Sequence, residues 1–433
     1  MTSLPERRPA ADPGDLLSRR QEVLGQAYRL FYQTPVAPVR AVGVEIFEAN
    51  GNRILDAYNN VPIVGHCHPR VLEAQCRQAA ILNTHTRYLT EPVVRYAEKL
   101  LRTMDDHLGR AMFTCTGSEA IDLALRIARM SGRPQGVVVS SNAYHGITAL
   151  AASVTPSLGP AWRQEPWVRT VEIPREVEDH RRGEAFAHRV QEAIDELQRT
   201  EFGFSALLID MALASDGLWL EPAGWLGMAC QMAQEAGGIV IADEVQAGFC
   251  RTGAYFWGHQ FHDVEPDLVV MGKSMANGLP VGGVVGRPEL VDGFGEQGRY
   301  FNTYGGNPVC MAAAEAVLDV IEEEALLSHA GDVGRTLQCG LRGLAGDHGS
   351  WVRVRVRGVG LFAAMEFLTI AGEGDSAASS RALNAFRDAG VLVGQCGPGN
   401  TAIKIRPPLP FSRENVEELL DVTRAVLEAD SRD

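Results

Sequence analysis

The sequence lacks an excess of basic residues, a long apolar run and any cysteine pair of the C-x-x-C type. Lys and Arg together number 40 against 54 Asp and Glu, so the formal net charge is −14. This balance argues against nucleic-acid binding, which needs a basic surface. No apolar stretch approaches the ~20 residues of a membrane-spanning helix, so we expect no membrane partner. The eight cysteines indicate reduced thiols, because disulfide frameworks are typical of short secreted chains.

Signals for export, for a dinucleotide and for a metal are also missing. The first residues, MTSLPERRPAADPGDLLSRR, are polar and contain no apolar core, which predicts a cytoplasmic protein. No G-x-G-x-x-G turn follows a first strand, which argues against a nicotinamide dehydrogenase. His66 and His68 within GHCHP are spaced as in a structural turn, so we expect no metal site.

Helical and strand-like segments alternate over most of the chain. Four short segments are apolar and β-branched, and each lies beyond a helical stretch: QGVVVSS, SALLIDMAL, GGIVIADEV and PDLVVMGK. This alternation is typical of a mostly parallel sheet covered by helices, hence of an α/β protein. We assign residues 61–310 to this large domain.

The two ends of the chain show other patterns. Residues 44–58, VEIFEANGNRILDAY, predict a hairpin with its turn at Asn50-Gly51-Asn52. A single long helix is predicted after Pro308, over VCMAAAEAVLDVIEEEALLSHA, and WVRVRVRGVGLFAAMEF alternates like antiparallel strands. We therefore expect a smaller α+β domain at 311–433, with residues 1–60 packed against it.

Polar side chains follow several predicted strands at their carboxyl ends, where sites gather in open α/β sheets. Thr116, Gly117 and Ser118 precede a helix that starts near Glu119. Hydroxyls, a glycine and the N–H groups of a helix N-terminus together favour a phosphate site. The alternative interpretation is an ordinary helix start with Ser118 as the N-cap.

Asp243 and Lys273 each follow a buried strand. A carboxylate at the end of GGIVIAD needs a partner, either a protonated ring nitrogen of a ligand or Arg251. A lysine shielded from water is a nucleophile toward carbonyls, unless its stem packs and its amine reaches solvent. Phosphate, ring nitrogen and aldehyde are together the three groups of pyridoxal 5′-phosphate, and Tyr144 or His145 is available to cover its ring.

With these residues in place, the sequence resembles the class III aminotransferases, which are pyridoxal-phosphate enzymes of fold type I. Seven motifs carry the resemblance, in the order they have in the family: GHCHP, TGSEA, AYHG, IADEVQAGFCRTG, PDLVVMGK, NTYGGNPV and IRPPL. They lie between residues 65 and 409 and include both Asp243 and Lys273.

The resemblance implies a role for each matching residue. Lys273 would form the Schiff base with the cofactor and move protons, and Asp243 would hold the pyridine nitrogen. The other implied cofactor contacts are Thr116, Gly117 and Ser118 for the phosphate, Tyr144 for ring stacking with His145 beside it, and Gln246 for the ring hydroxyl.

Substrate and partner contacts follow from the same resemblance. Thr303 stands where the family sends a threonine to the cofactor of the neighbouring subunit, which implies a homodimer with shared sites. Arg406 stands where many members bind a substrate carboxylate. Asp210 occupies the place of a usual Glu that can pair with this arginine, and its segment, DMALASDG, departs from the family pattern.

The predicted activity is transamination between a small-molecule amine, amino sugar or amino acid and a carbonyl acceptor, through a Lys273 Schiff base. The altered segment at Asp210 leaves room for a substrate of secondary metabolism. Within the family, AYNNVPIVGHCHP, NTHTRYL and FWGHQFHDVEPD look most like a subgroup that includes amino-alcohol phosphate phospho-lyases. Elimination of phosphate or hydroxyl is therefore the first alternative to transamination. Epimerisation and a non-catalytic pyridoxal-phosphate-binding protein are the further alternatives.

Overall fold

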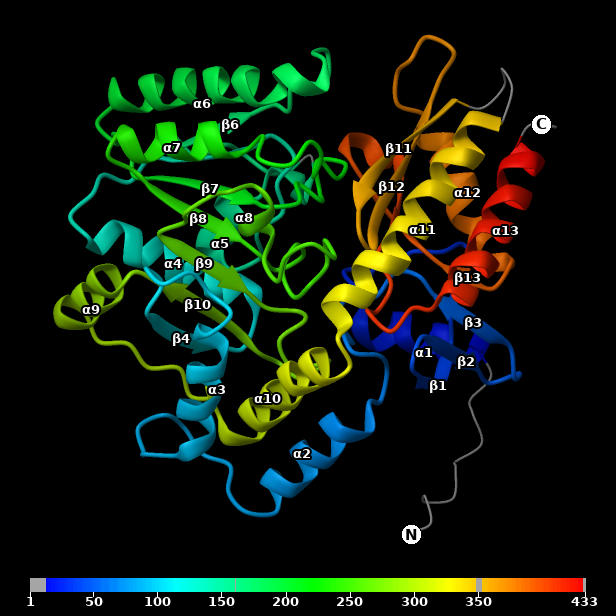
Figure 1. Cartoon of the computed structure of the whole chain (residues 1–433), viewed down its shortest axis with the longest axis horizontal. Coiled ribbons are helices and arrows are strands. Elements are labelled where there is room, and N and C mark those ends of the chain that lie inside the picture. The colour runs from blue at the N-terminus through cyan, green and yellow to red at the C-terminus, as the bar shows by residue number, and fades with distance from the viewer. Residues whose placement is uncertain (1–12, 160, 348–352, 431–433) are drawn as a thin grey trace.

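The computed structural model describes residues 13–159, 161–347 and 353–430. It shows a large α/β domain beside a smaller α+β domain (Figure 1). An α/β domain and an α+β domain are the two kinds of domain that the sequence predicted. The domain boundaries near residues 60 and 310 stay predictions. Among the described helices, none is long and apolar enough to cross a membrane. The cytoplasmic location also stays a prediction.

The central sheet of the large domain has seven strands in the order β4-β10-β9-β8-β7-β5-β6. Their bounds are β4 Arg110–Thr114, β5 Val137–Ser140, β6 Val168–Val171, β7 Ala206–Asp210, β8 Ile239–Asp243, β9 Leu268–Met271 and β10 Gly282–Gly286. Neighbours from β6 to β9 pair in parallel, whereas β10 runs antiparallel to both β9 and β4. The prediction of a mostly parallel sheet is confirmed.

Helices cover both faces of this sheet, as the near-continuous apolar strands require. Alternate residues of each strand face opposite sides, so Leu208 and Ile241 join the cluster around α4 (Gly117–Met130), while Leu207 and Val240 join the opposite cluster. The opposite face carries α6 (Arg182–Gln198) and α7 (Gly227–Glu235). The strand ends between these layers are the place where side chains can gather.

The remaining helices lie around this core and in the smaller domain. They are α1 Pro13–Leu24, α2 Pro69–Ala79, α3 Glu91–Leu101, α5 Ala149–Ser153, α8 Gly258–Phe261, α9 Pro288–Gln297, α10 Pro308–Glu323, α11 Leu326–Asp347, α12 Ser376–Asp388 and α13 Arg413–Asp430.

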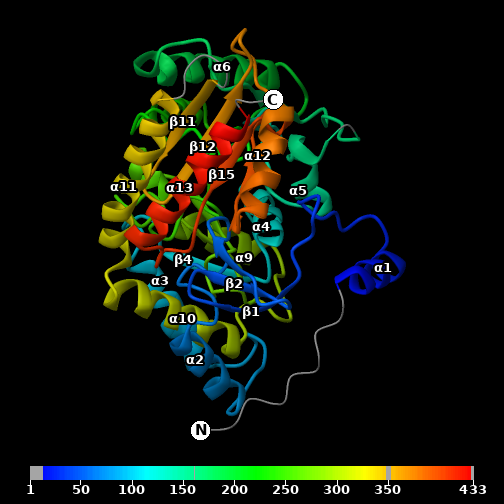
Figure 2. The same ribbon diagram turned by 90° about the vertical axis from the view of Figure 1, so that its right-hand side faces the viewer.

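The smaller domain contains a sheet of order β11-β12-β15-β14 with antiparallel neighbours. The bounds are β11 Arg353–Val359, β12 Phe362–Leu368, β14 Gly394–Cys396 and β15 Ala402–Ile405. The antiparallel strands expected from WVRVRVRGVGLFAAMEF are confirmed from Arg353 onward, since Trp351 and Val352 lie outside the described residues. Helices α11, α12 and α13 lie around this sheet (Figure 2).

A third sheet ties the start of the chain to its end. The predicted hairpin is confirmed by β2 (Glu45–Glu48) and β3 (Arg53–Asp56), which pair antiparallel, with β1 (Pro38–Val42) on the outer edge. On the other side, β3 pairs in parallel with β13 (Val391–Leu392). The N-terminal segment therefore shares a sheet with the C-terminal part of the chain.

The single long helix predicted after Pro308 is wrong. The segment forms two helices, α10 and α11, that meet at Ala325. Ala325 has a φ of 51°, in the left-handed region that ends a helix. Neither glycine nor proline marks this break, so the local sequence carried no signal for it.

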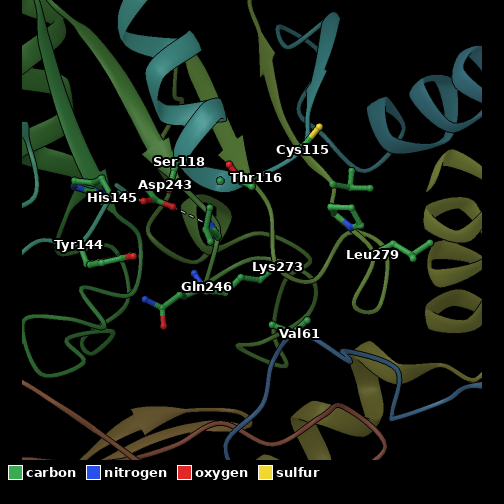
Figure 3. A pocket seen from close by; sticks show the side chains of 15 residues that line it. Val61, Cys115, Thr116, Ser118, Tyr144, His145, Asp243, Gln246, Lys273 and Leu279 are labelled. Carbon is green, nitrogen blue, oxygen red and sulfur yellow. Dashed lines mark hydrogen bonds and ion pairs between the residues drawn. The ribbon is translucent and has the colours of Figure 1, made fainter. Parts of the chain in front are cut away.

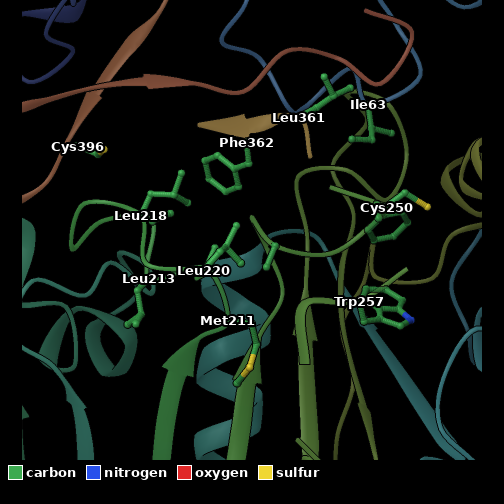
Figure 4. Packing of buried hydrophobic residues seen from close by; sticks show 14 of the residues in the cluster. Ile63, Met211, Leu213, Leu218, Leu220, Cys250, Trp257, Leu361, Phe362 and Cys396 are labelled. Atoms are coloured by element: carbon green, nitrogen blue, oxygen red, sulfur yellow. The ribbon is translucent and has the colours of Figure 1, made fainter. Parts of the chain in front are cut away.

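One hydrophobic cluster joins the two domains beyond the strand ends (Figure 4). Met211 and Leu218 follow β7, Leu361 lies in the turn before β12, and Phe362 is the first residue of β12. All four side chains are fully buried. Because packing at this junction sets how the smaller domain sits over the strand ends, it also sets the geometry of any site there.

Replacing Phe362 by Ala should lower the free energy of unfolding by about 3–5 kcal/mol, because a fully buried aromatic side chain leaves a cavity. Urea unfolding followed by tryptophan fluorescence measures the change. Ile370→Ala serves as the control, since Ile370 is 75% exposed and its truncation should cost less than about 0.5 kcal/mol. Equal midpoints for the two variants would contradict the role of this junction.

Candidate functional site

A cavity of about 310 Å³ lies at the carboxyl ends of the central strands (Figure 3). It brings together most of the predicted site residues: Thr116, Gly117, Ser118, Tyr144, His145, Asp243, Gln246 and Lys273. These residues come from separate loops and strand ends, as the parallel sheet topology predicts. Asp210, Thr303 and Arg406 do not line the cavity.

The N-terminus of α4 forms one wall of the cavity. Thr116 is its N-cap, because the Thr116 Oγ1 accepts the N–H of Glu119 at 3.1 Å. The alternative with Ser118 as the cap is therefore wrong. The N–H groups of Gly117 and Ser118, in the first turn, have no partner inside the helix. Free donors and the positive end of the helix dipole make this wall suited to a phosphate.

Two glycines allow the close packing around this wall. A Cβ atom on Gly272 would lie 3.2 Å from the Gly117 Cα, so glycine here lets Lys273 approach the helix start. Gly146 has a φ of 146°, and a Cβ atom there would lie 2.6 Å from the Ser118 Oγ. The Ser118 Oγ accepts the N–H of Ile147 at 3.1 Å. Ser118 therefore holds the loop that carries Tyr144 and His145.

Asp243 lies buried at the end of β8, with both carboxylate oxygens engaged. His145 donates its Nδ1–H to one oxygen at 2.7 Å, and Val245 donates its N–H to the other at 3.0 Å. Arg251 is not its partner, since its guanidinium donates to the carbonyl oxygens of Leu361 and Pro407. Because Asp243 still borders the cavity, its free lone pairs can accept a proton donor of a bound ligand.

The two aromatic candidates have different positions. Tyr144 is 40% exposed at the cavity wall, whereas the His145 side chain is fully buried and held by Asp243. Tyr144 is thus the one with a ring face open to a ligand, and His145 is better described as the support of Asp243.

Lys273 reaches the same cavity from the loop after β9. Burial lowers the pKa of its amine, and the positive charge of Arg406 lowers it further, while Asp243 and Asp210 oppose the shift. A lowered pKa increases the fraction of neutral amine near neutral pH. That is the form that attacks a carbonyl carbon.

Arg406 and Asp210 lie behind the cavity wall and do not meet each other. The Arg406 guanidinium donates to the Gln246 Oε1, and Gln246 itself borders the cavity. The two carboxylate oxygens of Asp210 accept the N–H groups of Ala212 and Ala214, each at 2.9 Å. Asp210 is therefore bound to its own turn, and burial followed by the charge of Asp243 raises its pKa.

Thr303 is exposed and lies outside the cavity of its own chain. Its implied contact with a neighbouring subunit stays a prediction.

The sequence interpretation missed Lys404, which lies on β15, just before the strand ends at Ile405 and two residues before Arg406. Its side chain is buried, and burial together with Arg406 lowers its pKa to about 8. The charge of Lys273 contributes to this shift, so Lys404 lies within electrostatic reach of the cavity. Its place two residues from Arg406 in IKIRPP was the only available signal.

The described residues contain no group of three or more His, Cys, Asp and Glu side chains arranged to hold a metal ion. His66 pairs with Asp56 at 2.6 Å and His68 with Glu324 at 3.3 Å, so the two histidines of GHCHP bind different carboxylates.

The donors in the cavity fit pyridoxal 5′-phosphate. Free N–H groups at the start of α4 suit its phosphate, the buried Asp243 suits its ring nitrogen, and the Lys273 amine suits its aldehyde. The cavity volume is at the lower end of the roughly 300–1,000 Å³ of small-molecule sites. The cavity therefore offers one matching protein group for each of the three polar groups of this cofactor.

Comparisons with known proteins agree with this chemistry. The model of the aminotransferase class-III family matches residues 29–427. An alanine–glyoxylate aminotransferase 2-like protein of Drosophila melanogaster is 36% identical, over 94% of this chain and 85% of that protein. The ethanolamine-phosphate phospho-lyase homolog 1 of Caenorhabditis elegans is 32% identical, over 95% of this chain and 93% of that protein.

A solved structure is similar over almost the whole chain. A phospholyase from Arthrobacter, in complex with phosphoethanolamine, superposes with a TM-score of 0.91 and 40% identity. The match covers 96% of this chain and all of that one. The relatives thus include proteins named for two different reactions.

Replacing Lys273 by Ala should abolish covalent attachment of pyridoxal 5′-phosphate, because it is the one lysine among the described residues that border the cavity. Lys404→Ala is the matched control, since it removes a second buried lysine with a lowered pKa. Mass spectrometry after borohydride reduction should show one cofactor per chain in the wild type and in Lys404→Ala, and none in Lys273→Ala. A modified Lys404 in any of these proteins would contradict the assignment.

Proposed function

This chain belongs to the class III aminotransferase family and is a pyridoxal-phosphate-dependent enzyme of fold type I, and from that premise we propose that it eliminates phosphate from a small amino-alkyl phosphate. Phosphoethanolamine, the ligand of the Arthrobacter phospholyase, is the simplest substrate of this class. The observation that carries the proposal is the pair of buried cations, Lys404 and Arg406.

This pair suits a phosphate better than a carboxylate. Within the described part of the chain, neither Lys404 nor Arg406 has a carboxylate partner in an ion pair, and Arg406 donates instead to Gln246. A phosphate dianion can bind two cations at once, whereas one arginine fork is enough for a carboxylate. Burying a cation without a counter-charge costs free energy, so an anionic group of the substrate would supply the negative charge that these two side chains lack.

The commitment of Asp210 to its own turn points in the same direction. A transaminase with one carboxylate-bearing and one neutral substrate must neutralise its arginine in one half-reaction. In this chain both oxygens of Asp210 hold backbone N–H groups, so Asp210 is not free to turn toward Arg406. An elimination has a single amino substrate and makes no such demand.

Each residue of the cavity would have a separate role in the reaction. Bound pyridoxal phosphate supplies an electron-withdrawing ring that acidifies the C–H bond next to the substrate nitrogen. Asp243 would keep the ring nitrogen protonated, and Tyr144 would cover the ring face. The neutral amine of Lys273 would accept the proton from carbon as a general base.

Lys404 and Arg406 would act on the leaving group. The C–O bond to phosphate breaks with the electron pair going to oxygen, and the two cations stabilise the phosphate that forms. Hydrolysis of the remaining nitrogen-bearing fragment consumes one water and gives an aldehyde and ammonia. Substrate and water thus balance aldehyde, ammonia and inorganic phosphate.

Transamination, the first prediction from the sequence, is the second candidate. Arg406 and the relative named as an alanine–glyoxylate aminotransferase 2-like protein favour it. Its substrates would be an amine, amino sugar or amino acid and a carbonyl acceptor, with Arg406 binding a carboxylate after its bond to Gln246 opens.

The reaction is tested by giving the holoenzyme phosphoethanolamine without an acceptor, and alanine with glyoxylate in a parallel assay. We expect inorganic phosphate, ammonia and aldehyde in equal amounts from the first, and no glycine from the second. Glycine formation from alanine and glyoxylate, without phosphate release in the first assay, would establish the transaminase instead.

Lys404→Met should raise KM for the phosphorylated substrate at least about tenfold, because a charged hydrogen bond worth about 1.5–3 kcal/mol is lost. Lys404→Arg should recover part of this loss, since it restores the charge. Steady-state phosphate release measures both variants. An unchanged KM in Lys404→Met would show that Lys404 does not bind the substrate.

We also propose that two chains form a homodimer with shared sites, as Thr303 implies. A large exposed apolar patch supports this proposal. It consists of Ile81, Leu82, Tyr88, Leu89, Phe301 and Tyr304. His85 connects its two segments by stacking on Tyr88 at 4.8 Å and meeting Phe301 edge-on at 5.5 Å. Exposed apolar patches of this kind mark protein interfaces, and Thr303 lies beside it in the chain.

Leu89→Asp should convert the dimer to monomer and weaken cofactor binding, because it places a charge in the apolar interface. Ile370→Asp is the control on another exposed apolar side chain. Analytical ultracentrifugation should show a dimer for the wild type and the control. A wild-type monomer that is fully active would refute the shared site.

A further inference from the structure

A second cavity, of about 590 Å³, lies between the large domain and the outer strand of the smaller one. It shares no lining residue with the cofactor cavity. One side comes from the segments around α6 and after β7, and the other from α11 and β11. Five arginines line it: Arg175, Arg182, Arg342, Arg355 and Arg357.

The positive charge of this cavity is only partly balanced. Glu366 is shared by Arg357 at 2.7 Å, Arg175 at 3.2 Å and Arg355 at 3.6 Å. Asp179 and Glu221 are the other two carboxylates that pair with its arginines. Among the described residues, these five guanidinium groups pair with three carboxylates, which leaves a charge of +2 in this group of side chains in a chain whose net charge is −14.

Two of these arginines are buried and held in place. The ring of Trp219 lies 4.2 Å from the Arg357 guanidinium and 4.8 Å from that of Arg182. The Arg182 side chain is only 6% exposed, and its Nε has no hydrogen-bond partner among the described residues. A guanidinium fixed against an aromatic ring is pre-organised, so little freedom is lost when it binds an anion.

The other cations stand nearer to solvent. Arg342 and Arg355 are each about half exposed, with side-chain exposures of 46% and 49%. The closest carboxylate oxygen to Arg355, on Glu366, is beyond hydrogen-bond distance. Arg355 can therefore turn to an incoming ligand without breaking a hydrogen bond to Glu366.

We propose that this cavity binds a small multivalent oxyanion of the phosphate-ester or pyrophosphate class, at a site separate from the reaction centre. Arginine forks match the paired oxygens of such an anion, and several forks facing one cavity select a ligand with more than one negative charge. The proposal does not depend on which reaction the enzyme catalyses.

Pyrophosphate is the probe, titrated calorimetrically into the holoenzyme, whose own phosphate cradle is then filled by the cofactor. We expect a binding event that weakens as salt rises and that does not require Lys404. Arg355→Gln should weaken it at least about tenfold, since one charged hydrogen-bonding group is lost. Arg353→Gln is the matched control, because Arg353 lies on the same strand and face but outside the cavity.

Two further variants make the result decisive. Arg355→Lys keeps the charge but loses the fork, and should bind with intermediate affinity. Lys404→Met tests binding at the reaction centre and should leave the affinity unchanged. Absence of binding by the wild type at low salt, or loss of binding in Lys404→Met but not in Arg355→Gln, would overturn the proposal. Thermal unfolding without ligand checks that the variants are folded.

Discussion

The hydrogen-bonded carboxylate of Asp243 is the constraint on which the rest of the site depends. A charged group at the end of a buried strand is stable only with partners, and His145 and Val245 supply them. Those bonds fix the orientation of the carboxylate at the cavity that it borders. The loop of His145 is in turn held by Ser118, at the start of α4. The start of α4 and the carboxylate of Asp243 are thereby linked through this loop.

The cations near the cavity come from both domains. Lys273 comes from the large domain, whereas Lys404 and Arg406 come from the smaller one, and each has a lowered pKa because it is buried. The apolar junction around Phe362 holds the two domains at the distance this arrangement needs. Asp243 and Lys273 border the cavity, while Lys404 and Arg406 are buried beyond its wall and act on it through their charge.

The sequence predicted the parts of this structure that are encoded locally. Parallel strands end at one edge of a sheet. The short apolar strands that lead to Asp243 and Lys273, and the segment at Gly117, were therefore expected to meet at that edge. Individual side-chain contacts and burial were not visible in the same way. Asp210 is bound to its own loop, and Lys404 is buried within reach of the charges of Lys273 and Asp210, which belong to the other domain. No glycine or proline marks the helix break at Ala325 in the sequence. Thr116 was recognisable as the N-cap of α4 only from its hydrogen bond to Glu119.

The protonation state of the cofactor nitrogen tests the central role of Asp243 most directly. Holoenzyme prepared with pyridoxal phosphate labelled with ¹⁵N in the ring can be studied by NMR near neutral pH. We expect a protonated ring nitrogen in the wild type and an unprotonated one in Asp243→Asn, which keeps the shape of the side chain but loses its charge. An unprotonated nitrogen in the wild type, or identical ¹⁵N shifts in both proteins, would contradict this role of Asp243.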